Sequence, residues 1–121
     1  MKDMETTIRR ATSNDISLWY GYIPYTMRAM ILEIGGVKVA IGGVMHKEGR
    51  LIAFMDLKSD PRNFPLSIMK ATFTALREIF VHYQQPIYAI VSDSLESAPR
   101  FLARIGFVPV DEKIMIFKRG D

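Results

Sequence analysis

The residues best placed to do chemistry lie between Phe54 and Ala71, which read FMDLKSDPRNFPLSIMKA. The pattern predicts a strand, a short loop and the start of a helix, an arrangement that often holds a phosphate group on the first amides of the helix. Lys58, Arg62 and Lys70 surround the predicted helix start. Glycines usually let the backbone approach the phosphate, but this segment contains none. It is therefore either a phosphate site with altered chemistry or a connection whose cations are simply solvated.

Other kinds of site find little support in the composition. The chain has no cysteine, which excludes a disulfide, a thiolate nucleophile and a cysteine-ligated metal. Its two histidines, His46 and His82, fall in a predicted turn and late in a predicted helix, and two histidines without cysteines argue against a metal site. The net charge of +3 comes from scattered residues, which favours an anionic ligand and argues against nucleic acid.

The length and composition of the chain are those of one ordinary globular domain. A chain of 121 residues, 49% hydrophobic and 24% charged, fits a single core, so residues 1–121 are treated as one domain. The opening MKDMETTIRR has no apolar segment, and no later apolar run reaches the ~20 residues that span a bilayer. Together with the lack of cysteine, this predicts a cytoplasmic protein without membrane contact.

The first half of the chain predicts a strand, a short helix and an antiparallel meander. The helix begins at one of several N-cap candidates between Thr12 and Asp15, and its aromatic residues are expected to pack over the sheet. Gly35-Gly36 marks a hairpin turn, and Gly42-Gly43 indicates a bulge or a close backbone approach. The predicted elements are a strand at 6–11, a helix ending before Pro24, and strands at 27–34, 37–45 and 51–57.

The second half predicts a crossover and a closing hairpin. A long helix stops at Gln84-Gln85-Pro86, and the strand at 87–91 would lie parallel to the strand before the helix. A second helix ends at Gly106, before strands at 107–110 and 113–118. The expected fold is an α/β (α+β) mixed sheet, mostly antiparallel with one parallel β-α-β crossover and helices on its faces.

The long helix also predicts part of the core. Apolar residues recur along one of its faces, and charged residues take the opposite face. We expect burial of Phe73, Leu76, Phe80, Phe101 and Ile105, and exposure of Arg77, Glu78 and Arg104.

The two ends of the chain, IRRATSNDIS and SLESAPRFLARIGFVPV, resemble the GNAT family of N-acetyltransferases. In that family an Ile-Arg strand leads into a Thr-x-x-Asp helix cap, and a late helix precedes a Leu-Gly-Phe-type turn. The late match is carried by Ala98, Phe101, Leu102, Ile105, Gly106 and Phe107. A closer likeness, through AIGG at 40–43 and RFL-x-x-IG at 100–106, is to small phage-encoded GNAT-like proteins, including internal virion proteins of short-tailed phages.

This resemblance implies a single GNAT-like domain that uses acetyl-CoA to acetylate an amine. In the family, the fourth and fifth strands splay apart and the pantetheine arm pairs with strand four. Residues 54–58 and 87–92 occupy those places, so the resemblance assigns Met55 and Leu57 to the cofactor.

The family's pyrophosphate loop would follow strand four. Its positions fall on Arg62, Asn63 and Ser67, and Pro65 lacks the amide proton that a glycine would offer there. Lys58, Arg62, Ser67 and the helix dipole would compensate through charge-assisted contacts.

Acetyl transfer also requires a base for the amine and an acid for the leaving thiolate. Many relatives supply the acid from a tyrosine on the last helix, where this chain has Leu102. The substitutes are Tyr88, Ser92 and Ser94 as acids, and Asp56 and Glu33 as bases. The alternative for each carboxylate is a solvated residue on the outward face of a strand.

The segment between the first two predicted strands is short. Only residues 13–26 separate the first two strands, where relatives place two helices beside the acceptor. The pocket for a small-molecule or protein amine would then be small, open or built by a second subunit in a homodimer. The altered loop, the missing tyrosine and the short front leave open a second interpretation, a catalytically inactive GNAT-fold protein that acts as a binding or virion component.

Overall fold

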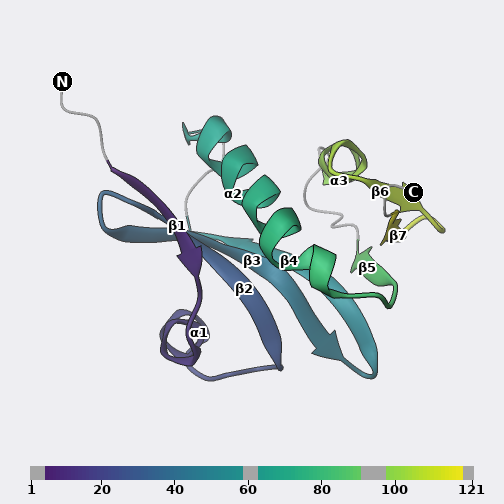
Figure 1. Ribbon diagram of the computed structural model, residues 1–121, viewed down its shortest axis with the longest axis horizontal. Coiled ribbons are helices and arrows are strands. Elements are labelled where there is room, and N and C mark those ends of the chain that lie inside the picture. The colour runs from purple at the N-terminus through teal and green to yellow at the C-terminus, as the bar shows by residue number, and fades with distance from the viewer. Residues whose placement is uncertain (1–4, 59–62, 91–97, 119–121) are drawn as a thin grey trace.

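The structure, a computed structural model, describes residues 5–58, 63–90 and 98–118 (Figure 1). Seven strands form one sheet in the order β1-β2-β3-β4-β5-β7-β6, with antiparallel pairs except between β4 and β5. The elements are β1 Thr6–Arg10, α1 Ser13–Tyr20, β2 Met27–Ile34, β3 Val37–Lys47, β4 Arg50–Leu57, α2 Pro65–Glu78, the 3-10 helix η2 Phe80–His82, β5 Ile87–Ile90, α3 Ala98–Arg104, β6 Phe107–Pro109 and β7 Ile114–Phe117. The predicted mixed, mostly antiparallel sheet and its parallel crossover are confirmed.

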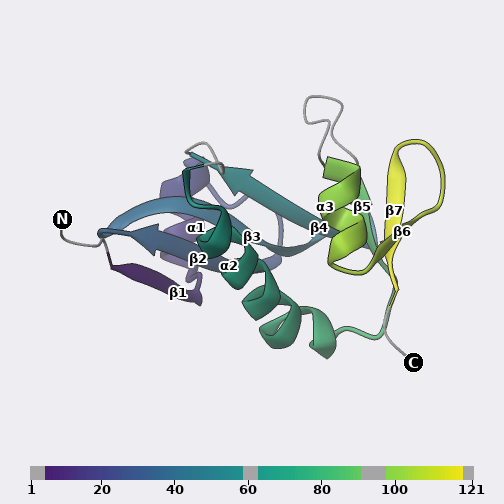
Figure 2. The same cartoon turned by 90° about the horizontal axis from the view of Figure 1, so that it is seen from above.

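The two faces of the sheet carry different helices. Met30 belongs to the core cluster that includes α2, whereas its neighbours Ala29 and Ile31 pack with Ile16 of α1. Because successive side chains of a strand point to opposite faces, α1 and α2 lie on opposite sides of the sheet. Figures 1 and 2 show α2 across the half formed by β1 to β4, and α3 beside β5, β6 and β7.

The start of α1 is fixed by a buried carboxylate. Thr12 is the N-cap, and its hydroxyl accepts from the Asp15 amide while Asp15 Oδ2 accepts from the Thr12 amide at 2.7 Å. Arg9 donates two hydrogen bonds to the same carboxylate, at 2.7 and 3.0 Å, and Lys38 Nζ lies 3.2 Å from it. The bonds from Arg9, then that from the Thr12 amide, hold the pKa of Asp15 well below its usual range.

The paired glycines of β3 reflect a close backbone approach. A Cβ atom on Gly43 would lie 2.0 Å from the Arg28 carbonyl oxygen of β2, so no larger residue fits there. The irregularity in this pair of strands lies between Leu32 and Glu33. Of the two interpretations of Gly42-Gly43, the close approach at Gly43 is therefore the correct one.

The predicted core of the long helix needs correction. Phe80 is 5% exposed as expected, but Phe73 is 44% exposed, because α2 meets the sheet through Ile68, Ala75 and Ile79. Leu76 and Ile105 are half-buried, and Arg77, Glu78 and Arg104 are exposed as predicted. The side chain of Phe101 lies outside the described residues. The helix also stops at Glu78, where the chain tightens into η2.

Phe80 lies in the core cluster that α2 shares with the last hairpin. Its ring makes edge contacts with Phe107 and Phe117 of the last hairpin, with centroids 6.2 and 5.2 Å apart. It thereby connects the end of α2 to β6 and β7.

Replacing Asp15 by asparagine should lower the free energy of unfolding by about 2 kcal/mol at pH 7, because bonds to a charged acceptor are lost. Since the folded-state pKa is depressed, the advantage of the wild type should be full above about pH 5 and decline as the pH falls below about 4. Urea unfolding at several pH values measures this, with the exposed Glu5→Gln as the control. Equal stability of the two proteins at pH 7 would contradict it.

Replacing Phe80 by alanine should cost about 3 to 5 kcal/mol, because it empties a buried aromatic cluster. Phe73→Ala, a matched change on the exposed side of α2, should cost about 1 kcal/mol or less. Chemical denaturation of both variants tests the corrected orientation of the helix, and equal losses would show it to be wrong.

Candidate functional site

The two central strands meet only briefly. β4 pairs with β5 at Leu51↔Ile87 and Ile52↔Tyr88, and beyond these pairs β4 continues along β3 while β5 continues along β7. Figure 2 shows the two strands running apart from this point. The predicted adjacency and divergence are confirmed, although the contact lies at Leu51 and Ile52 rather than within residues 54–58. We call the space where pairing stops the β4–β5 opening.

One edge of the opening carries backbone hydrogen-bonding groups. The Lys58 amide donates to the Val39 carbonyl at 2.9 Å, which sets the alternation of the β3–β4 ladder. In an antiparallel pair, alternate residues bond to the partner strand. The amides and carbonyls of Ala53, Met55 and Leu57 therefore point away from β3, toward the opening.

A cavity of about 670 Å³ adjoins the opening. Its walls come from β2, β3, β4, α2, η2, β5, α3 and β6. It is lined from both faces of the sheet, since Ala53 belongs to the cluster on the α2 side and Phe54 to the cluster on the α1 side. Residues of β4 whose side chains belong to both faces of the sheet therefore border the cavity where β4 and β5 separate.

Only some of the residues predicted to bind a cofactor lie at the cavity. Met55 and Leu57 line the cavity, whereas Asn63 and Ser67 lie at the start of α2 without lining it. Arg62 lies outside the described residues. Lys58 is turned toward α1, with its ammonium 4.3 Å from the centre of the Trp19 ring.

The start of α2 has no side-chain cap. Phe64 occupies the N-cap position without a capping hydrogen bond, Pro65 follows it, and the first turn contains no acidic residue. The first amides of the helix therefore have no partner from a cap side chain, and the helix dipole is not offset there by a carboxylate.

Of the predicted acids and bases, the three that the structure describes, Glu33, Asp56 and Tyr88, do not line the cavity. Glu33 accepts a hydrogen bond from Arg9 Nε at 3.0 Å, in the network that holds Asp15. Tyr88 of β5 has the Arg50 guanidinium 6.0 Å from its ring centre. Ser92 and Ser94 lie outside the described residues.

Asp56 lies on the face of the sheet that carries α1. It accepts a hydrogen bond from the Tyr20 hydroxyl, and burial first, then this bond, raises the pKa of Tyr20 above its usual value. Trp19 and Tyr20 pack against the cluster around Ile16, as predicted, whereas Tyr22 and Tyr25, for which the same packing was expected, are exposed. The pairing of Tyr20 with Asp56 was not predicted, because the two residues are 36 positions apart and packing alone explained the aromatic ring.

A metal site and a membrane-spanning helix find no support in the described part of the chain. No three side chains among its His, Asp and Glu residues gather as metal ligands would. No helix there is long and apolar enough to cross a membrane.

Comparison with known proteins bears on the fold alone. Neither models of known families nor curated proteins give a match. Among solved structures, the chain is similar to an uncharacterized protein from Bacillus halodurans, with a TM-score of 0.64 and 13% sequence identity. The match covers 95% of this chain and 84% of that one, so this arrangement of elements also occurs in a crystal structure.

Of the five tyrosines, Tyr20 should ionise at a pH well above 10. Asp56→Asn should lower its pKa only in part, because burial is the larger cause. Absorbance titration at alkaline pH measures both, with Tyr20→Phe identifying the late-ionising group. Because the folded-state pKa is raised, stability should fall as the pH rises above about 10. A Tyr20 pKa that does not change in Asp56→Asn would contradict the hydrogen bond.

Proposed function

We propose that the chain binds acetyl-CoA and transfers its acetyl group to an amine. The observation that carries the proposal is the β4–β5 opening, where backbone groups of β4 point toward a cavity large enough for a ligand. The resemblance of the two chain ends to GNAT acetyltransferases, and that family's splayed strands, support the same ligand.

In this proposal the amide groups of the pantetheine arm pair with the backbone of Met55 and Leu57, as an added strand would. The pyrophosphate lies at the uncapped start of α2, where the Ser67 amide and the helix dipole favour an anion. Arg62 adds charge, and so does Lys58 once its ammonium leaves the Trp19 ring.

The transfer itself is a direct attack. The amine nitrogen forms a bond to the thioester carbon, the carbon–sulfur bond breaks, and the sulfur leaves with the electron pair. Asp56 accepts the proton of the attacking amine from the α1 side of the sheet, with Tyr20 bound to its carboxylate. Tyr88 is the described candidate to protonate the thiolate.

A second candidate is a protein of the same fold that binds without catalysis, including a virion component. One observation favours it: no carboxylate, imidazole or tyrosine hydroxyl among the described residues lines the cavity. The homodimer, the cytoplasmic location and the nature of the amine stay predictions.

Calorimetric titration with CoA and acetyl-CoA tests binding. We expect dissociation constants in the tens of micromolar, about 6 to 7 kcal/mol, which weaken with salt because side-chain charge replaces oriented amides. Lys58→Ala with Arg62→Ala should abolish binding, and Lys113→Ala with Lys118→Ala, which removes the same charge at the other end of the fold, should leave it unchanged. Absence of binding at millimolar CoA would overturn the proposal.

Release of free CoA in the presence of a panel of amines tests transfer. Asp56→Asn should slow transfer by at least about 100-fold while CoA still binds, since a general base contributes factors of that order. Binding without turnover in the wild type would favour the non-catalytic candidate.

A further inference from the structure

The cavity is a half-open pocket whose lining is mostly apolar. Its volume of about 670 Å³ falls in the range of ligand-binding sites, which are concave and lined mainly by hydrophobic side chains.

Small residues create this space. Among the lining residues of α2 and of the strands, several are alanine or glycine, whose side chains leave the space beside them unfilled. The small lining residues are Ala40, Gly42, Ala53, Ala71, Ala75 and Ala89.

The cavity is elongated along α2. Lining residues of this helix extend from Pro65 to Leu76, which is roughly 17 Å of helix axis. The end near Pro65 adjoins Leu57 and the start of α2, where the proposed function places the polar part of CoA. The other end continues toward Phe80 and Phe107.

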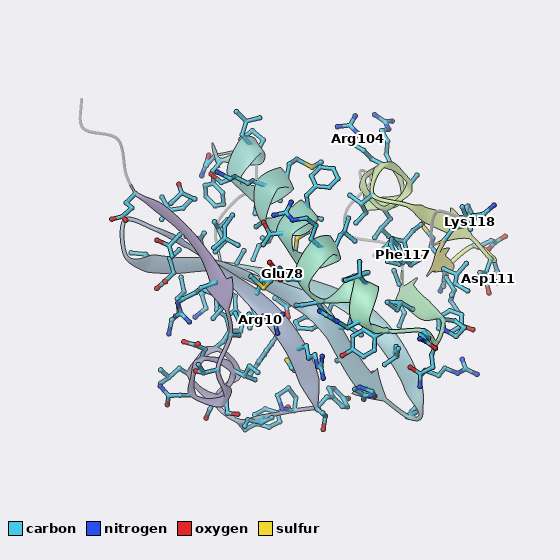
Figure 3. All side chains as sticks on the ribbon, viewed as in Figure 1. Arg10, Glu78, Arg104, Asp111, Phe117 and Lys118 are labelled. Carbon is cyan, nitrogen blue, oxygen red and sulfur yellow. The ribbon has the colours of Figure 1, made fainter. Side chains whose placement is uncertain are left out.

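The far end offers mainly hydrocarbon and aromatic surface. Thr72 lines the cavity, but its hydroxyl already donates to the Ile68 carbonyl at 2.8 Å. Lys47 and Arg104 also line it, yet the Lys47 ammonium lies over the Tyr25 ring and Arg104 is exposed, projecting from the outer side of α3 (Figure 3). A polar ligand placed there would leave its hydrogen-bonding groups unpaired, which is costly.

We infer that the far end of the cavity holds the aliphatic chain of an acyl group longer than acetyl, so that the favoured cofactor is a medium- or long-chain acyl-CoA. This inference rests on the proposed function, because CoA carries the chain into the cavity. An acetyl group would leave most of the far end empty, whereas an aliphatic chain removes its own apolar surface and that of the walls from water.

Titration with CoA, acetyl-CoA, hexanoyl-CoA and decanoyl-CoA, each below its micelle concentration, tests the inference. Affinity should rise along the series, with decanoyl-CoA at least about 30-fold tighter than acetyl-CoA, a modest part of the gain expected for full burial of the added methylenes. Equal affinities for acetyl-CoA and decanoyl-CoA would overturn the inferred preference for a long acyl group. The proposed function would not be affected by that result. Failure of every thioester and of CoA to bind would overturn both.

Two variants test whether the acyl chain lies in the cavity. Ala75→Leu and Leu76→Phe enlarge lining side chains of α2. Each should remove most of the difference in affinity between decanoyl-CoA and acetyl-CoA. Ala103→Leu, on an exposed position of α3, is the matched control and should keep the gain. Thermal unfolding confirms that each variant is folded, and the second cavity variant serves if the first is not.

If decanoyl-CoA still binds more tightly than acetyl-CoA in both cavity variants, the acyl chain binds elsewhere and the inference is overturned. Free decanoate that binds as tightly as decanoyl-CoA would overturn the assignment to a thioester.

Discussion

The β4–β5 junction determines the shape of the rest of the molecule. Two residue pairs, Leu51↔Ile87 and Ile52↔Tyr88, join the half of the sheet under α2 to the half that contains the last hairpin. Phe80 strengthens the junction, because its ring packs between α2 and the aromatic residues of β6 and β7. A longer ladder would close the opening, and a weaker core at Phe80 would leave the halves poorly connected.

The junction also divides the proposed chemistry between the two faces of the sheet. The α2 face offers an apolar space and an uncapped helix start, which suit binding. The α1 face offers Asp56 with Tyr20, which suits proton transfer. Because the cavity is lined from both faces, the opening is where a bound thioester and an attacking amine would meet in the proposed reaction.

Local signals explain what could be predicted from the sequence. The Thr12 cap, the turn at Gly35-Gly36 and the crossover depend on neighbouring residues and on hydrophobic spacing, and the structure confirms them. The orientation of α2 depends on which side chains face the sheet, so periodicity alone placed Phe73 in the core wrongly. The cavity and the Tyr20–Asp56 pair depend on contacts between distant segments. The recurring alanines were the one sequence signal for the cavity.

The backbone groups of β4 that point into the opening have a further consequence. A sheet normally has two edges, both at its margin, but the separation of β4 from β5 creates additional edges inside this one. A strand edge with unpaired amides and carbonyls can accept a strand from another molecule, which is a common route to aggregation. In the proposed function, a ligand whose amide groups pair with β4 would therefore also shield this inner edge from strand pairing with another molecule.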